Sequence, residues 1–213
     1  MSKSGQAFGK TDRRQAIIEA ALQIIGEEGT SALTHRRVAG RAAVSLSATT
    51  YYFSSLNDIF EQALLLSAQR ELSELAAVHR AFDRGETTIG EWAGGVARVL
   101  ADETRGRELT LLLAQFEMDL AAARRPALRK AVAQLNARYE GLTEPVLRRA
   151  GSPRPAADAH VFVAAVTGLL LAQVSSPAAD FAEAVLRPAI VRLVEAFTGS
   201  AARSSFPEQV CER

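Results

Sequence analysis

The amino-acid sequence predicts an all-α protein of about nine helices. Apolar residues recur at helical spacing along all 213 residues, Ala is abundant, and the alternating β-branched runs that indicate strands do not occur. Hydrophobic residues make up 48% and charged residues 23% of the chain, which is typical of a globular protein. The length suits one large domain or two small ones.

Four helices are predicted in the N-terminal third from capping residues and apolar spacing. Ser or Thr stands at the expected N-cap of each helix, and Gly29 ends the first one. Ser55 and Asp58 have the spacing of a capping box, in which each residue's side chain accepts a bond from the other's backbone. The predicted ranges are 11–29, 34–41, 45–52 and 55–78.

Five further helices are predicted in the remainder of the chain. The strongest loop signal is the Gly- and Pro-rich stretch 151–155, and Pro188 is expected to kink or interrupt the last helix. The predicted ranges are 88–104, 107–123, 126–146, 156–175 and 180–198. We expect residues 1–10 to form a flexible arm and residues 199–213 a flexible tail.

Several classes of protein are disfavoured by the rarer residues. Cys211 is the single cysteine, so an intrachain disulfide and a Cys-based zinc site are excluded, and His79 and His160 have no partners at metal-ligand spacing. The apolar stretch 161–174 is shorter than the roughly 20 residues of a membrane span, which favours a buried helix. No secretory signal opens the chain, so we expect a cytoplasmic protein without metal or cofactor.

The distribution of charge along the chain is compatible with a local nucleic-acid-binding site. The net charge is only +1, which argues against broad, indiscriminate binding to nucleic acid. Residues 1–56, however, hold seven Lys or Arg against four Asp or Glu, whereas the rest of the chain is slightly acidic. The sequence therefore predicts a modestly basic N-terminal part on a slightly acidic body.

Residues 34–53 have the pattern of a helix-turn-helix, in which a first short helix crosses the DNA backbone and a second enters the major groove. Arginines at the start of the first helix suit phosphates, and the short side chains of the second allow its backbone to lie deep in the groove. The predicted DNA contacts are Thr34, Arg36, Arg37, Ser45, Leu46, Ser47, Ala48, Thr49, Thr50, Tyr51 and Tyr52, with Lys10 from the basic arm.

On spacing alone, two alternatives stay open for this region. A small surface helical hairpin with solvated arginines would have the same pattern. The arm that contains Lys3, Lys10, Arg13 and Arg14 would reach an adjacent groove or remain a solvated tail. His35 is expected to be solvated or close to a phosphate rather than a metal ligand.

Residues 12–65 resemble the N-terminal DNA-binding domain of the TetR (tetracycline-repressor-like) family. The resemblance lies in an ordered set of motifs: Ile17–Ile25 with Glu28-Gly29, Thr34-x-x-x-Val38-Ala39, Val44-Ser45, Tyr51-Tyr52-Phe53 and Ser55-x-x-Asp58-Ile59. Three positions depart from the family pattern. Ala43 replaces the usual turn glycine, the usual Tyr of position 50 is displaced to Tyr51, and Leu56 replaces a Lys.

The resemblance implies a helix-turn-helix domain over residues 1–56 and a ligand-binding and dimerisation domain over residues 57–198. It further implies a homodimeric transcriptional regulator, by default a repressor that a small, largely apolar effector releases from a palindromic operator in double-stranded DNA. The helix that begins at Ser55 would join the two parts and act as a lever. An enzyme is disfavoured because no phosphate loop, nucleophile elbow or HExxH motif is present. The alternative is a helical protein-binding adaptor without DNA function.

Two sets of residues follow from the family resemblance and the apolar pattern. The predicted ligand-binding residues are Trp92, Leu112, Phe116, Glu117, Met118, Leu120, Leu135, Tyr139, Phe162 and Val166. The predicted dimer-interface residues are Leu169, Leu170, Val174, Phe181, Ile190, Leu193 and Phe197. The alternatives are plain core packing for the first set and, for the second, a helix over 156–175 that is buried within a monomer.

Overall fold

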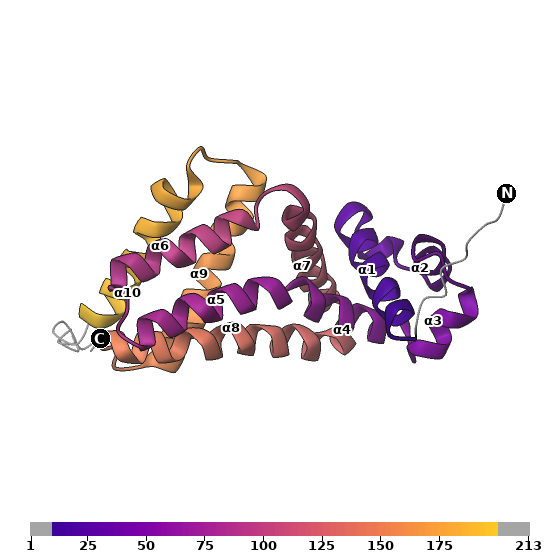
Figure 1. The fold of residues 1–213 in the computed structure, drawn as a ribbon, viewed down its shortest axis with the longest axis horizontal. Helices are drawn as coiled ribbons and strands as arrows, with labels where there is room; N and C mark the ends of the chain where they lie inside the picture. Colours follow the sequence, from indigo (N-terminus) through magenta and orange to yellow (C-terminus); the bar gives the residue numbers. More distant parts are fainter. Residues whose placement is uncertain (1–9, 200–213) are drawn as a thin grey trace, which may run out of the picture. The chain divides into compact units, whose positions relative to one another are not determined.

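The structure, a computed structural model, describes residues 10–199, apart from the side chains of Lys10, Thr11 and Arg107. Within this range the chain forms ten α-helices and no strand, which confirms the predicted all-α class (Figure 1). The helices are α1 (Lys10–Glu28), α2 (His35–Arg41), α3 (Leu46–Tyr52), α4 (Leu56–Ser67), α5 (Gln69–Asp83), α6 (Ile89–Asp102), α7 (Gly106–Arg124), α8 (Arg129–Ala150), α9 (Pro155–Ser175) and α10 (Arg187–Gly199). Lys3 and nearly all of the predicted arm and tail lie outside the described residues.

One predicted helix is divided, which gives ten helices instead of nine. The helix expected over 55–78 ends at Ser67, and α5 begins at Gln69 after the buried Ala68. Neither Gly nor Pro stands at this break, so the sequence carries no local signal for it. The first helix begins at Lys10, so Thr11 lies inside α1 and is not its N-cap as predicted.

Prolines mark two of the remaining helices. The predicted interruption near Pro188 is confirmed: a π-helical turn over Phe181–Leu186 precedes α10, and Pro188 is the second residue of that helix. Proline is tolerated there because the first backbone N–H groups of a helix have no internal partner. Pro145 lies inside α8, a feature that the sequence reasoning overlooked.

The helices gather into two compact units. One comprises residues up to Ser73 together with Asp102–Ala137, and the other comprises Glu74–Ala101 together with the chain from Arg138. Helices α5 and α8 each contribute to both units. The division differs from the expected boundary at residue 56 because α1 packs along both α4 and α7.

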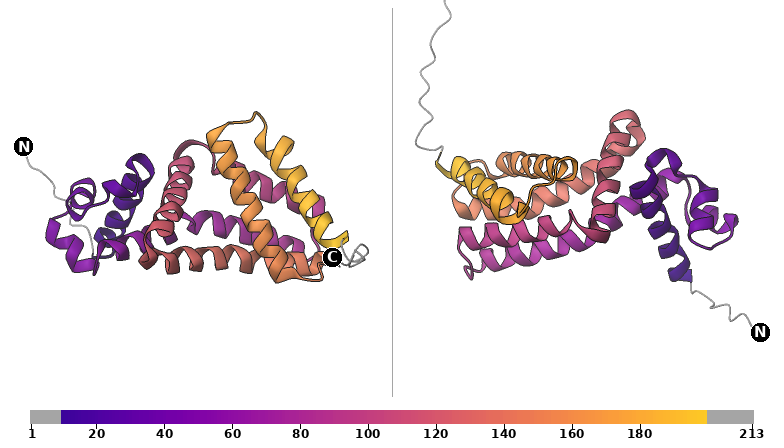
Figure 2. Two further views of the ribbon diagram at one scale, coloured as in Figure 1. Left: turned by 180° about the vertical axis from the view of Figure 1, so that it is seen from behind. Right: turned by 90° about the horizontal axis from the view of Figure 1, so that it is seen from above.

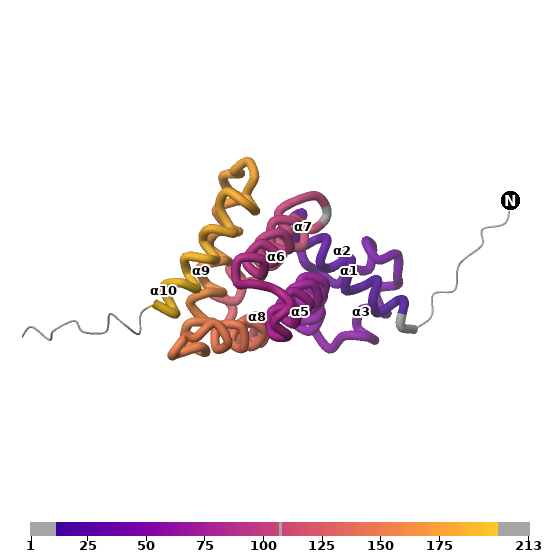
Figure 3. Tube along the Cα trace, turned by 60° about the vertical axis from the view of Figure 1, so that its left-hand side comes forward, coloured from indigo at the N-terminus to yellow at the C-terminus, as the bar shows by residue number. Residues whose placement is uncertain are grey.

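The core of the first unit is built around α1. Its apolar face, which includes Ile17, Ile24 and Ile25, is fully buried. Helix α2 packs against α1, and α3 packs against α2 (Figure 3). At Gly26 the backbones of α1 and α7 touch: a Cβ atom added there would lie 2.3 Å from the carbonyl oxygen of Thr110. Glycine is therefore required for this helix crossing.

The core of the second unit is an aromatic cluster. The ring of Trp92 on α6 lies 5.7 Å from that of His79, 6.0 Å from that of Phe82 and 5.9 Å from that of Phe162. All four side chains are buried. The cluster thus joins α5, α6 and α9.

Helix α9 is apolar on most of its surface but is covered on one side only. Phe162, Val166 and Leu170 form a buried stripe, whereas Val161 and Leu171 are 49% and 50% exposed. The alternative of a helix buried within a monomer is therefore wrong. By length and composition alone α9 could cross a membrane, contrary to the expectation from its short apolar core. Figure 2 shows that α9 and α10, which a loop connects, lie next to each other.

Candidate nucleic-acid interface

The two short helices form a helix-turn-helix as predicted. Thr34 caps α2, its Oγ1 accepting a hydrogen bond from the backbone N–H of Arg37 at 3.2 Å. Ser45 caps α3 in the same way, its Oγ accepting from the backbone N–H of Ala48 at 3.3 Å. Between them Ala43 has a φ of 53°, the left-handed conformation that a glycine would adopt freely, which for Ala stores about 1–2 kcal/mol of strain.

Most of the predicted DNA contacts lie on the surface of this motif. The exposed members are Thr34, Arg36, Arg37, Ser45, Leu46, Ser47, Thr50 and Tyr51. Leu46 and Tyr51 are the large hydrophobic side chains among them, with 53% and 70% of their surface exposed. Ala48 and Tyr52 are half-buried, and the side chain of Lys10 lies outside the described part.

Thr49 does not belong to the exposed face, so the prediction that it reads bases is wrong. It is fully buried, and its Oγ1 donates to the carbonyl of Leu46 at 2.8 Å. The same oxygen lies 3.0 Å from Nδ1 of His35, which is therefore engaged in packing α2 against α3. Helix α3 is rotated so that position 49 faces the inside, and a helix of only seven residues is too short to give a periodic signal of this orientation.

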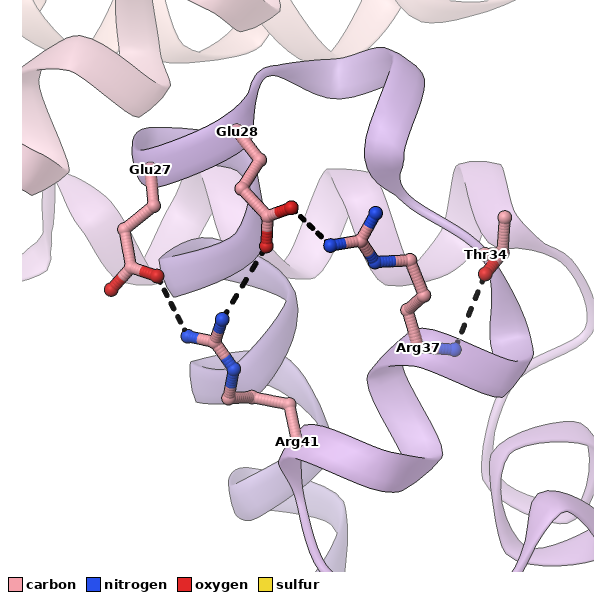
Figure 4. Close-up of polar contacts among 5 residues, drawn as sticks. All are labelled: Glu27, Glu28, Thr34, Arg37 and Arg41. Atoms are coloured by element: carbon pink, nitrogen blue, oxygen red, sulfur yellow. Dashed lines mark hydrogen bonds and ion pairs between the residues drawn. The ribbon is translucent and has the colours of Figure 1, made fainter.

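Two arginines of α2 form ion pairs with the end of α1 (Figure 4). Arg37 pairs with Glu28, while Arg41 pairs with Glu27 at 2.9 Å and with Glu28 at 3.4 Å. Arg41 was missed by the sequence reasoning because its partners lie 13 and 14 residues away across a turn. Arg36 is exposed and has no carboxylate partner among the described residues.

The arginines of the predicted arm differ from one another. Arg14 is half-buried, donates a hydrogen bond to Gln62 Oε1 at 2.8 Å and lies 5.2 Å from the centre of the Phe53 ring. It therefore fastens α1 to α4 instead of reaching out to DNA. Arg13 is exposed on the first turns of α1.

The predicted ligand residues are divided between the two units. In the first unit Leu112, Met118 and Leu135 are buried, and Phe116 is half-buried. Leu120 is 55% exposed, so it cannot line an enclosed pocket and that prediction is wrong.

Glu117, predicted as a polar handle for a ligand, lies beside the end of α1. Its Oε2 is 3.3 Å from the position of a Cβ on Gly29. A separate cavity of about 460 Å³ in the same unit is lined from α1, α4, α5 and α7 and includes Glu19, Glu27 and Glu108. None of the predicted ligand residues lines this cavity.

In the second unit Trp92, Phe162 and Val166 are buried and Tyr139 is half-buried. The indole Nε1 of Trp92 and the Nε2 of His79 are buried without a hydrogen-bond partner. Burial lowers the pKa of His79, so the ring is neutral near pH 7. Unpaired polar atoms are rare in a core. The Nε1–H of Trp92 is a donor, whereas Nε2 of the neutral His79 ring is an acceptor, because its Nδ1 donates to the carbonyl of Leu75 at 2.6 Å.

The predicted dimer residues also separate into two groups. Leu170, Phe181 and Ile190 are buried in their own unit, so they cannot offer surface to a second chain and are withdrawn from the predicted interface. The members that retain exposed surface are Leu169, Val174, Leu193 and Phe197. Leu169 and Leu193 line a groove of about 400 Å³ between α9 and α10.

Comparison with known families decides the identity of the chain. A family model described as "Bacterial regulatory proteins, tetR family" matches residues 17–63. A second, "Tetracyclin repressor-like, C-terminal domain", matches residues 87–196, about half of the chain. The chain belongs to the tetR family of bacterial regulatory proteins.

Two regulators are similar to this tetR-family chain. The regulator BetI of Rhizobium meliloti (strain 1021) is 38% identical over 60 residues, 28% of this chain and 27% of that protein. The nicotine-responsive transcriptional repressor HdnoR of Paenarthrobacter nicotinovorans is 30% identical over 116 residues, 54% of this chain and 57% of that protein. The aligned part of the chain therefore spans about a quarter and somewhat over half of these two regulators.

A solved structure covers more of the chain. The multidrug binding protein EbrR, complexed with imidazole, is 31% identical with a TM-score of 0.67 over 85% of this chain and 94% of that chain. Crystal structures of EbrR also exist with ethidium, proflavin and malachite green.

A half-buried carboxyl on α7 of this tetR-family chain gives a stability prediction. Burial raises the pKa of Asp119 to about 6, so the folded chain holds a proton that the unfolded chain releases between about pH 4 and 6. The free energy of unfolding therefore falls as the pH rises through this window. Asp119→Asn is expected to be more stable than the parent by about 1–2 kcal/mol at pH 7, after allowance for solvent screening, and to lose this advantage near pH 4.

Urea unfolding at both pH values measures this difference. Asp102→Asn removes an exposed carboxyl of α6 and is expected to stay within about 0.5 kcal/mol of the parent. An Asp119→Asn variant equally stable to the parent at pH 7 would show that the carboxyl is well solvated.

Proposed function

We propose that this chain is a ligand-responsive, DNA-binding transcriptional regulator that acts as a repressor on a palindromic operator. The observation that carries the proposal is the exposed face of the α2–turn–α3 motif, where Ser47, Thr50 and Tyr51 lie free of the core and Arg36 lies on the neighbouring helix. This arrangement suits base-edge contacts from α3 and phosphate contacts from α2. The similarity to HdnoR, a transcriptional repressor by name, supports repression.

The active form proposed is a homodimer that pairs through α9 and α10. Val161 and Leu171 expose apolar surface on α9, and the groove at Leu169 and Leu193 can receive side chains of a second copy. Two copies related by a two-fold axis would form a four-helix interface and present two reading helices to one operator. Half-sites one DNA turn, about 34–36 Å, apart would match such a dimer.

The proposed effector is a small, largely apolar molecule that shifts the dimer out of its DNA-binding state. Support comes from the apolar side chains of α7, such as Leu112 and Met118, and from the similarity to EbrR, a multidrug binding protein complexed with aromatic compounds. Helix α7 also touches α1 directly at Gly26, which offers a path from ligand to reading head within one unit. The effector acts only to the extent that it binds the two states with different affinity.

The proposed role as a DNA-binding regulator also implies where the chain works and which activities it lacks. As a DNA-binding regulator the chain would work in the cytoplasm, and the exposed face of α9 would be covered by protein and not by lipid. We infer no catalytic role and no metal or cofactor. A protein-binding adaptor remains the outcome if the chain binds no DNA.

Binding to the DNA upstream of its own gene tests the function by fluorescence anisotropy over a range of salt concentrations. Arg36→Ala is expected to weaken binding to all sequences and to reduce the salt slope by about 1. Ser47→Ala is expected to leave the salt slope unchanged and to alter sequence preference at one position by about 1 kcal/mol, the net contribution of one neutral hydrogen bond. Arg80→Ala removes an equal charge from α5 and serves as the control. If Arg36→Ala and Ser47→Ala both bind as the parent does, the reading face is misplaced.

A further inference from the structure

The last turn of α1 carries two consecutive carboxylates that local helix physics does not favour. Glu27 and Glu28 end the helix, and that turn holds no basic residue. Negative charge at a helix C-terminus is repelled by the helix dipole. Their partners come instead from another helix, because Arg37 and Arg41 of α2 reach across to them (Figure 4).

These ion pairs lie at the surface that faces solvent. The side chains of Arg37 and Glu28 are 48% and 33% exposed, and those of Arg41 and Glu27 are 36% and 49% exposed. Pairs this accessible exchange partners readily, since each contributes little stability in water. Carboxylate and phosphate offer guanidinium the same kind of paired oxygens, so DNA phosphate is a direct competitor for both arginines.

We infer that Glu27 and Glu28 act as an internal counter-charge that competes with DNA phosphates for Arg37 and Arg41 and so weakens binding to DNA of arbitrary sequence. The inference rests on the proposed DNA-binding function. A phosphate that recruits either arginine must displace a carboxylate, and the displaced carboxylate then repels the phosphate. The two glutamates are positioning residues that act through the arginines.

Arg36 provides the contrast on the same helix. It is exposed and has no carboxylate partner among residues 10–199, so its charge is available to phosphate without any exchange. Helix α2 therefore has one arginine that contributes fully to non-specific binding and two whose contribution is reduced. Electrostatic attraction supplies nearly all non-specific affinity for DNA, so this reduction favours the sequence-dependent contacts of α3.

The test uses the full-length chain and a random-sequence DNA duplex, with anisotropy measured between about 50 and 200 mM salt. The variant Glu27→Gln/Glu28→Gln keeps the shape of both side chains and is expected to bind about 3- to 10-fold more tightly, with a salt slope steeper by about 1 for each released arginine. The matched control is Glu19→Gln, which removes a charge from the same helix at a carboxylate that accepts, among the residues that the structure describes, only from Gln15, at 3.1 Å. Its slope is expected to equal that of the parent.

A second set of variants distinguishes competition for Arg37 and Arg41 from a general effect of the negative charge on Glu27 and Glu28. In an Arg37→Ala/Arg41→Ala background the two Glu→Gln substitutions are expected to give no gain in affinity and no change in slope. An equal gain in that background would mean that the acids act through space, which overturns the inference. Weaker binding together with a lower unfolding midpoint in the otherwise unsubstituted chain would mean that they are only a structural tie.

Failure of the proposed function gives a different result. If the parent chain binds no DNA at the lowest salt, both the proposed function and the counter-charge are wrong. If the parent binds and Glu27→Gln/Glu28→Gln behaves as the parent, the counter-charge alone is wrong.

Discussion

Gly26→Ala is expected to destabilise the chain by about 2–3 kcal/mol and to abolish measurable operator binding at physiological salt. A Cβ at this position would lie 2.3 Å from the carbonyl oxygen of Thr110 and 2.6 Å from its Cγ2. The obstructing atoms include backbone, so no rotamer change can relieve the overlap and α1 must move away from α7. Urea unfolding gives the loss of stability, and anisotropy with operator DNA gives the loss of binding.

Gly40→Ala is the matched control for this substitution. Gly40 also lies inside a helix of the same unit, but nothing lies within 4 Å of its Cβ position. Alanine there is expected to stabilise the chain by up to about 1 kcal/mol, because glycine is a poor helix former. A Gly26→Ala variant as stable as the parent would show that the two helices are not held at this distance.

Leu171→Glu is expected to raise the dissociation constant of the dimer by at least about 100-fold. The side chain is 50% exposed on α9, so the substitution leaves the fold of one chain intact. In a two-fold interface each substitution occurs twice, so two carboxylates would be buried against apolar surface. Sedimentation equilibrium over a range of protein concentrations measures the constant.

Leu120→Glu controls for the loss of an exposed leucine elsewhere. Leu120 is 55% exposed on α7, away from α9 and α10 in the chain, and its substitution is expected to leave the association unchanged. A Leu171→Glu variant that associates as strongly as the parent would exclude this face of α9 from the interface. A parent chain that is monomeric at all concentrations would contradict the proposed dimer itself.

The helix starts were the most predictable features because capping is local in the sequence. The side chains of Thr34, Ser45 and Ser55 each accept a hydrogen bond from the backbone N–H three residues later, as predicted from residue type and spacing. The capping box at Ser55 differs in one detail. Asp58 accepts from the backbone N–H of Ser54 and not from that of Ser55.

Features that depend on distant residues could not be predicted. The pairing of Arg41 with Glu27 joins two helices across a turn, and the burial of Thr49 depends on the rotation of α3 against α2. Helix α9 shows the same limit in another form. When nearly every position of a helix is apolar, the sequence does not distinguish its buried face from its exposed face. It therefore could not reveal that Leu170 is buried and Leu171 exposed. The roles of the DNA, ligand and dimer residues stay predictions.

The inward turn of Thr49 has a consequence for the kind of operator that this chain would recognise. The surface that α3 retains consists of an isobutyl group, hydroxyls and a phenol, from Leu46, Ser47, Thr50 and Tyr51. None of these offers the two-pronged hydrogen bonding by which Arg selects guanine or Asn and Gln select adenine. Discrimination would rest on single hydrogen bonds to base edges, on thymine methyl groups and on the bendability of the duplex. Such readout gives a degenerate consensus, and one regulator of this kind would serve a family of related sites.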